Sequence, residues 1–154
     1  MIKIEKVLVP TDFSDFSKLA IQYGLSFCRE YGAKMILLHV LEDPFYPATG
    51  ASFGFDMSDF FTRMEAESRE RLEEIVTPEM AKGIDIERVL VRGTPFLEII
   101  REAKERRVDM IVVATHGRSG LAHVLMGSVT EKIVRKAPCP VLVVREAQHE
   151  FIMP

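Results

Sequence analysis

Short apolar runs along this chain alternate with stretches in which apolar residues recur at helical spacing. The runs at 4–10, 35–41, 110–114 and 141–144 are rich in Val, Ile and Leu, which is typical of buried strands. Residues 84–91 alternate between apolar and polar positions, and this alternation favours a strand at the edge of a sheet. The pattern therefore predicts five strands.

The first two predicted helices are marked by their apolar faces and by glycines near their ends. Gly32 follows the first helix at the position of a C-cap, and Gly83 closes the region of the second. Asp56 or Ser58 is the predicted cap of the second helix, which follows a loop at 42–55. The apolar face of the first helix holds Phe16, Leu19, Ala20, Tyr23, Phe27 and Tyr31, and that of the second holds Phe61, Met64, Leu72, Ile75 and Val76.

The last two predicted helices have recognisable starts. Thr94 is the predicted cap of the third helix, with Pro95 at its first helical position. The buried stripe of this helix is expected to consist of Phe96, Ile99, Ile100 and Ala103. Ser128 and Glu131 have the S-x-x-E spacing of a capping box, so the fourth helix is predicted to begin there.

Strands that alternate with helices of this length predict an α/β fold with an open parallel sheet and helices on both faces. At 154 residues and 47% hydrophobic content, residues 1–154 are expected to form a single domain with its own core. In such folds, ligands bind beyond the carboxyl ends of the strands, where the strand order reverses. The residue pattern by itself leaves the strand order open.

The charge and cysteine content narrow the classes of function. A net charge of −3 provides no electrostatic reason to expect binding to nucleic acid or to an anionic membrane. Cys28 and Cys139 lack the spacing of a metal site or a disulfide framework, so reduced thiols are expected. The sequence shows no pattern of a secretory leader and no apolar run of membrane-spanning length, and we therefore expect a cytoplasmic protein.

The stretch from 110 to 134 joins a predicted strand, a loop with glycines at 117, 120 and 127, and a helix start. Glycines let main-chain N–H groups approach a ligand closely, and a helix start offers unpaired donors at the positive end of its dipole. These features favour a cradle for phosphate. A tight turn followed by an ordinary helix cap is the alternative interpretation of the same residues.

The same stretch resembles the nucleotide-binding loop of the universal stress protein family, which is written G-x2-G-x9-G-[ST]. Ala114, Gly117, Gly127 and Ser128 fill this frame, with alanine in place of the first glycine. The resemblance continues in V-L-V-P-T-D-F-S near the start, in H-V at the end of the second strand, and in A-P-C-P-V-L-V-V near the end. It therefore covers essentially the whole chain.

The resemblance implies a Rossmann-like, five-stranded parallel sheet of order 3-2-1-4-5, in which residues 10–12 lie beside residues 114–117. It implies binding of ATP, or of ADP or AMP. Asp12 is a candidate for organising a phosphate-bound Mg²⁺, and its alternative role is that of a turn residue or helix cap. The implied nucleotide-binding residues are Pro10, Thr11, Asp12, Val40, Ala114, Gly117, Arg118, Gly127, Ser128, Val129 and Thr130. The resemblance also implies a homodimer formed through the last strand, which consists of Val141, Leu142, Val143 and Val144.

The function implied is that of an ATP-dependent regulatory module in a stress response. The alternatives are an interaction protein of the same fold that does not bind ATP, and a slow ATPase. The chain has no Walker loop of the form G-x-x-x-x-G-K-[ST] and no G-x-G-x-x-G after the first strand, which argues against a classical kinase or dehydrogenase. His39 lies in an apolar strand and is expected to be a hydrogen-bonded core histidine rather than a catalyst.

Overall fold

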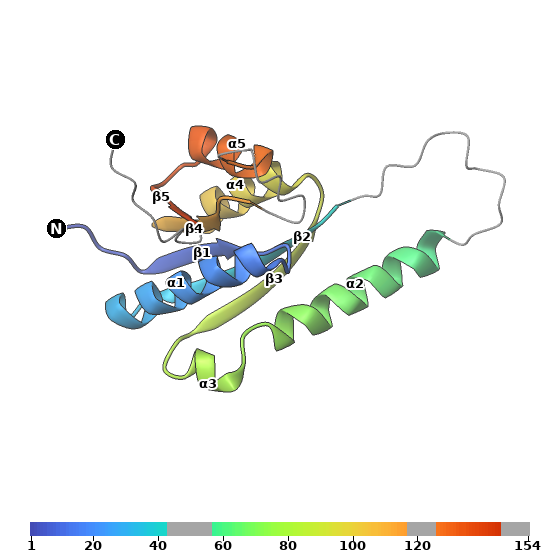
Figure 1. Ribbon diagram of the computed structural model, residues 1–154, viewed down its shortest axis with the longest axis horizontal. Helices are drawn as coiled ribbons and strands as arrows, with labels where there is room; N and C mark the ends of the chain where they lie inside the picture. Colours follow the sequence, from blue (N-terminus) through green and yellow to red (C-terminus); the bar gives the residue numbers. More distant parts are fainter. Residues whose placement is uncertain (43–56, 117–125, 146–154) are drawn as a thin grey trace, which may run out of the picture.

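A computed structural model of the chain describes residues 1–42, 57–116 and 126–145. The elements are labelled and coloured along the chain in Figure 1. In chain order they are β1 (Lys6–Pro10), α1 (Asp15–Tyr31), β2 (Lys34–Leu41), α2 (Met57–Glu74), α3 (Pro78–Ala81), β3 (Ile86–Arg92), α4 (Pro95–Glu105), β4 (Met110–Ala114), α5 (Ser128–Lys136) and β5 (Val141–Val144). The five predicted strands are all present, with some ends shifted by one or two residues.

The five strands form one parallel sheet in the order β3-β2-β1-β4-β5. Val7 of β1 is in register with Met35 of β2 on one side and with Met110 of β4 on the other. The strand order reverses between β1 and β4, so the connections that leave these two strands run to opposite faces. The predicted order 3-2-1-4-5 and the edge position of β3 are both confirmed.

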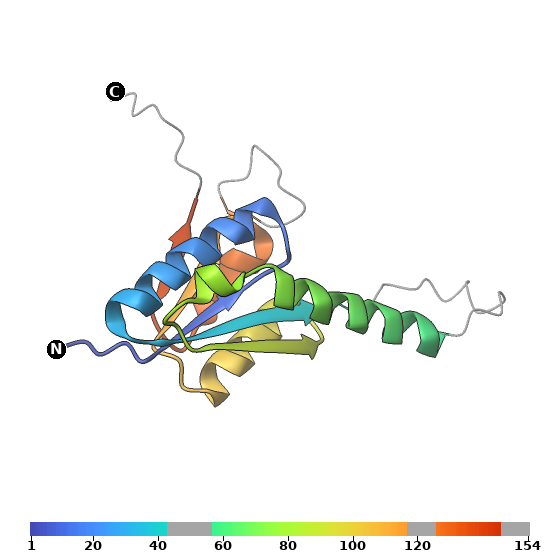
Figure 2. The same cartoon turned by 90° about the horizontal axis from the view of Figure 1, so that it is seen from below.

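Helices cover both faces of the sheet, with α1, α2 and α3 on one face and α4 and α5 on the other (Figures 1 and 2). Successive residues of a strand point to opposite faces. Val7 and Val9 therefore pack in the cluster that contains Ile21 of α1, whereas Leu8 packs in the cluster that contains Ile133 of α5. Because each central strand is buried on both faces, its sequence is a continuous apolar run.

Helix α1 lies close to the sheet through Gly24. A Cβ atom at Gly24 would lie 2.5 Å from Cγ2 of Val9, so a side chain there would force the Val9 side chain, the strand or the helix to shift. The helix starts at the N-cap Ser14, whose hydroxyl accepts from the Ser17 amide. It ends at Gly32 in the left-handed conformation, with φ of 64°, which confirms the predicted C-cap.

The predicted capping box of α5 is wrong. Gly127 occupies the N-cap position, so Ser128 is the first helical residue, and no side-chain capping bond is present. A serine at the first helical position lies one residue too late for the reciprocal bonds of a capping box. The carboxylate of Glu131 instead pairs with Arg135 one turn further along, at 3.0 Å.

The other predicted caps have mixed outcomes. Ser58 lies inside α2 and is therefore not its cap, and Asp56 lies outside the described residues. Thr94 occupies the N-cap position of α4 and Pro95 follows it as predicted, although the Thr94 side chain makes no capping hydrogen bond. The sequence pattern did not predict α3, a single turn that is capped by the side chain of Thr77.

The amino-terminal half of α2 extends beyond the sheet, while its carboxy-terminal half packs against it (Figures 1 and 2). Leu72 in the second half is buried, whereas Phe60 in the first half is exposed. The guanidinium of Arg92, at the end of β3, lies 3.7 Å from the centre of the Phe61 ring and links the extended half to the sheet.

Two expectations from composition can be compared with the described residues. None of the helices they form is long and apolar enough to cross a membrane. Cys28 and Cys139 are free thiols, the first of them buried, as expected for reduced cysteines.

Candidate functional site

A cavity of about 870 Å³ lies at the carboxyl ends of the strands, where the strand order reverses. Its walls are the ends of β1, β2 and β4, the first turns of α4 and α5, and one face of α2. These segments are distant in sequence and meet because parallel strands end at the same edge of the sheet. The volume is typical of small-molecule sites.

The turn after β1 forms a rigid part of the cavity wall around Thr11. The amide of Thr11 donates to the carbonyl of Leu38 in the neighbouring strand at 2.8 Å. Its hydroxyl lies 2.9 Å from Oγ of Ser17 and accepts from the Phe13 amide at 3.0 Å. Because each polar group of the Thr11 side chain and amide is engaged, the turn has little freedom to rearrange around a ligand.

Asp12, the next residue, stabilises the turn and also lines the cavity. Its Oδ1 accepts from the amide of Ser14 at 3.0 Å, which makes Asp12 a turn residue, while Ser14 itself caps α1. Asp12 also lines the cavity, so its negative charge lies beside the space that a ligand would occupy.

Phe13 and His39 pack beneath this turn. Phe13 has a φ of 66°, a left-handed conformation that costs a non-glycine residue about 1–3 kcal/mol. Its ring centre lies 4.3 Å from that of His39. Nδ1 of His39 donates to the carbonyl of Thr11 at 2.7 Å, and the residue is buried, so His39 is the hydrogen-bonded core histidine that the sequence suggested.

The first turn of α5 is tied to the end of β4 by two hydrogen bonds. The amide of Gly127 donates to the carbonyl of Thr115 at 2.7 Å, and the hydroxyl of Thr130 donates to the carbonyl of Ala114 at 2.7 Å. The first hydrogen bond within the helix runs from the amide of Glu131 to Gly127 at 3.0 Å.

The amides of residues 128–130 precede that first bond and therefore have no acceptor within the helix. Together with the positive end of the helix dipole, these amides form a site that would stabilise a bound anion. Glycine fits best just before them, because a Cβ at Gly127 would lie 3.2 Å from the carbonyl oxygen of Thr115 and would push the two segments slightly apart. This close approach keeps the helix start against the strand end.

Ala114 occupies the place of the first motif glycine, and the structure shows how alanine is accommodated. It is the last residue of β4, paired with Val144, and its backbone does not adopt a positive φ. Its side chain belongs to the apolar cluster on the α1 face of the sheet. The position therefore needs no conformation that alanine resists.

The charged side chains among the described lining residues are the carboxylates of Asp12, Glu42 and Glu67 and the guanidinium of Arg71. A polyphosphate in the cavity would meet an excess of negative side-chain charge, which the amides at the start of α5 offset in part. No cluster of three or more His, Cys, Asp or Glu side chains suited to a metal occurs within 1–42, 57–116 and 126–145. A cation bound there would need ligand oxygens as well as Asp12.

The structure brings together the site residues expected from the sequence that fall within the described ranges. They line the same cavity, and they are Pro10, Thr11, Asp12, Val40, Ala114, Gly127, Ser128, Val129 and Thr130. Gly117 and Arg118 lie outside the described residues.

Sequence reasoning missed the contribution of α2. Met64, Glu67, Ser68 and Arg71 also line the cavity, and they follow one another at the i, i+3, i+4, i+7 spacing of a single helix face. That spacing is visible in the sequence, but the apolar pattern of the helix includes only Met64 among these four residues. Which side of α2 meets the cavity depends on how the helix packs on the sheet.

Comparison with known proteins identifies a family match and relatives that cover most of this chain. The model of the universal stress protein family matches residues 3–145. Universal stress protein MJ0577 of Methanocaldococcus jannaschii is 30% identical over 157 residues, covering 94% of this chain and 96% of that protein. Universal stress protein YxiE of Bacillus subtilis is 31% identical over 145 residues, covering 91% of this chain and 98% of that protein.

Solved structures show the same fold. The structure of MJ0577 superposes with a TM-score of 0.81 at 28% identity, covering 96% of this chain and 99% of that one. A universal stress protein crystallised in complex with cAMP superposes with a TM-score of 0.60 at 26% identity, covering 93% and 98%. Since the family match spans nearly the whole chain and full-length relatives share its fold, this chain belongs to the universal stress protein family.

Proposed function

We propose that this chain binds an adenine nucleotide in the cavity at the carboxyl edge of the sheet and acts as a nucleotide-dependent regulatory module in a stress response. ATP with Mg²⁺ is the proposed ligand, and ADP and AMP have the same anchoring chemistry. The observation that carries the proposal is the set of amides at residues 128–130, which have no acceptor among the described residues and are held by two hydrogen bonds in the wall of a ligand-sized cavity.

The proposal assigns the two ends of the ligand to different walls. The phosphates would accept hydrogen bonds from the first turn of α5, where the charge of the helix dipole is positive. The base and ribose would lie against the ends of β1 and β2, near Pro10, Thr11 and Val40. Gly117 and Arg118 are proposed as further phosphate contacts, and Asp12 as a group that organises a phosphate-bound Mg²⁺. A relative's complex with cAMP supports a site of this chemistry in the family.

The proposal also includes a homodimer formed through β5. Hydrogen bonds from Ile111 to Pro140 and from Thr115 to Val144 show that alternate residues of β5 face β4. The backbone groups of Val141 and Val143 therefore point away from β4, toward the open edge of the sheet. An unpaired apolar edge promotes uncontrolled association, and pairing with a second copy across a two-fold axis would remove that hazard.

A charge placed at the helix start tests the nucleotide site. Ser128 is exposed at the first helical position, where an acidic side chain stabilises a helix by about 0.3–1 kcal/mol. Ser128→Glu should therefore fold, yet its carboxylate would repel phosphate, and Ser128→Gln is the neutral control of equal size. Gly127→Glu is a less clean probe, because its Cβ would press on the Thr115 carbonyl.

The measurement is calorimetric titration of Mg²⁺–ATP into nucleotide-stripped protein. Wild type should bind saturably, and Ser128→Glu should bind at least about tenfold more weakly than Ser128→Gln, which corresponds to about 1.4 kcal/mol. Absence of saturable binding in folded wild type, or equal binding by the glutamate and glutamine variants, would overturn the proposed site and favour an interaction protein that does not bind ATP.

A further inference from the structure

The cavity has a second polar wall on α2, opposite the segments that carry the family motif. Met64, Glu67, Ser68 and Arg71 project from one face of this helix into the same cavity as the end of β2. The other residues of the charged surface of α2 do not line the cavity, as Arg69 illustrates: it is exposed and pairs with Glu65 at 2.7 Å. Substitutions on the exposed face of α2 can therefore serve as controls for substitutions on its cavity face.

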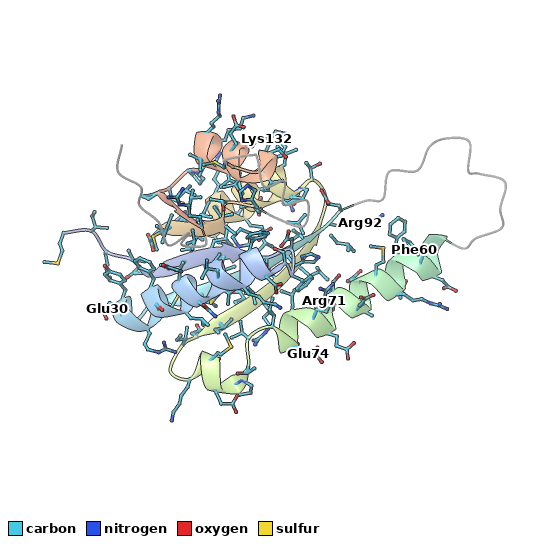
Figure 3. The ribbon with its side chains drawn as sticks, viewed as in Figure 1. Glu30, Phe60, Arg71, Glu74, Arg92 and Lys132 are labelled. Atoms are coloured by element: carbon cyan, nitrogen blue, oxygen red, sulfur yellow. The ribbon has the colours of Figure 1, made fainter. Side chains whose placement is uncertain are left out.

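Arg71 is fixed in place by an aromatic ring rather than by a carboxylate. Its guanidinium carbon lies 4.2 Å from the centre of the Phe13 ring, and Figure 3 shows the residue on α2 beside the sheet. In the part of the chain that the structure describes, no acidic side chain pairs with this guanidinium, although Arg69 and Arg88 each have a carboxylate partner. The donors of Arg71 therefore remain available to a ligand.

Ser68 provides a second polar group on this wall of the cavity. The residue is only 8% exposed and lines the cavity, and its hydroxyl has no hydrogen-bond partner among the described residues. A helical serine commonly bonds to the carbonyl four residues earlier, as Ser26 does with Gln22 at 2.9 Å. The hydroxyl oxygen is reached from the cavity, so a ligand group that replaces its hydrating water would gain about 0.5–1.5 kcal/mol.

The α2 wall lies at the end of the cavity to which the proposed function assigns the base and ribose. Phe13, on which Arg71 stacks, is in ring contact with His39 of β2, one residue before Val40. The helix start that would hold phosphate is tied instead to the end of β4, through Thr115 and Ala114. The two polar walls therefore meet different parts of an extended nucleotide.

We propose that Ser68 and Arg71 form a recognition site for the nucleoside part of the bound nucleotide. The inference rests on the proposed nucleotide-binding function and assigns specificity within that site. The Ser68 hydroxyl can donate or accept a single hydrogen bond with a base or ribose. The Arg71 guanidinium presents N–H donors and a flat cationic surface, which suit the ring acceptors and the face of a purine.

The test compares a ligand that has a nucleoside with one that has none. Mg²⁺–ATP and Mg²⁺–tripolyphosphate would each be titrated into nucleotide-stripped wild type, Ser68→Ala, Arg71→Ala and the matched surface control Arg69→Ala. Far-UV circular dichroism would establish that each variant is folded. We expect the serine and arginine variants to lose about tenfold in ATP affinity, the net effect of one hydrogen bond or stacked cation, with tripolyphosphate unaffected. Arg69→Ala should match wild type for both ligands.

The outcomes separate this inference from the function on which it rests. If wild type binds ATP and both cavity-wall variants bind it equally well, the nucleoside site is wrong and the nucleotide site stands. If Arg71→Ala weakens ATP and tripolyphosphate to the same extent, Arg71 acts on phosphate and the assignment to the nucleoside is overturned. If folded wild type binds neither ligand, both proposals fail together.

Discussion

The hydroxyl of Thr130 donates a 2.7 Å hydrogen bond to the carbonyl oxygen of Ala114, joining the first turn of α5 to the last residue of β4. Both residues are buried, at 4% and 5% exposure. The bond satisfies a carbonyl at the end of the strand, and it also fixes the direction in which the first-turn amides of α5 point. Thr130 therefore acts by positioning the anion site, since the proton of its hydroxyl is already donated within the protein.

Replacing Thr130 with valine should destabilise the fold, because valine keeps the shape of the side chain but leaves the Ala114 carbonyl without its donor. We expect the free energy of unfolding to fall by about 1–3 kcal/mol. Thr130→Ser keeps the hydroxyl and should recover most of the loss. Urea denaturation would measure both variants, and equal unfolding free energies for valine and serine would show that the bond contributes nothing.

Gly24→Ala should be destabilising although alanine favours helix by about 1 kcal/mol over glycine. The new Cβ would lie 2.5 Å from Cγ2 of Val9, and relieving that overlap should cost about 1–3 kcal/mol. The double variant Gly24→Ala/Val9→Ala removes the clashing methyl, so the penalty of Gly24→Ala should shrink in the Val9→Ala background. Additive unfolding free energies across this cycle would contradict the proposed overlap.

Glu87 should make stability depend on pH. Hydrogen bonds from Lys34 and then from Arg106 hold the pKa of the Glu87 carboxyl below its usual range. Its contribution to stability is therefore present above the pKa of the unfolded chain, about 4.3, and is lost as the pH falls through the lower folded pKa. Because the side chain is 37% exposed, solvent screening keeps the contribution below about 1 kcal/mol.

The expected result is that Glu87→Gln unfolds slightly more easily than wild type at neutral pH, and that this difference closes in acid. Unfolding free energies of both proteins across the acid range would measure it. A difference that stays constant with pH would mean that the glutamine disturbs packing rather than removing a charge.

Cys28 should be unreactive in the folded protein. Burial raises the pKa of its thiol to about 11, so little thiolate exists at mildly alkaline pH, and the side chain is inaccessible to a reagent. Burial, and then the charge of Asp109, also raise the pKa of the Cys139 thiol, but Cys139 is only partly buried. Titration with a thiol reagent should therefore modify Cys139 slowly and Cys28 only as fast as the protein unfolds.

Cys139→Ser provides the control, because it leaves Cys28 alone in the chain. Its modification rate should equal the unfolding rate measured independently. Rapid reaction of Cys28 in this variant under native conditions would contradict the burial seen in the structure.

Val143→Pro should dissociate the proposed dimer while leaving the monomer folded. The Val143 amide points to the open edge of the sheet, so proline removes a donor that only a second copy would use. Val143→Thr keeps that donor and is the control. Light scattering after size exclusion should give a dimer for wild type and the threonine variant and a monomer for the proline variant. A monomeric wild type, or a dimeric proline variant, would refute pairing through β5.

The sequence alone determined which of the longer elements form and in what order. Apolar runs and helical spacing predicted five strands and the four longer helices, because burial on a sheet or a helix face imposes a local period that residues must obey. The glycine and proline positions at 32 and 95 likewise predicted a helix end and a helix start, since backbone conformation there depends on the residue itself.

The tertiary structure decided which residues meet and which hydrogen bonds they make. The capping box at Ser128 was wrong because the contact of Gly127 with Thr115 starts the helix one residue earlier, and no local pattern reveals that contact. Ser68 and Arg71 face the cavity only because α2 packs on the sheet in one orientation. Local periodicity specifies a face of a helix, whereas the partner of that face is specified by packing between segments that are distant in sequence.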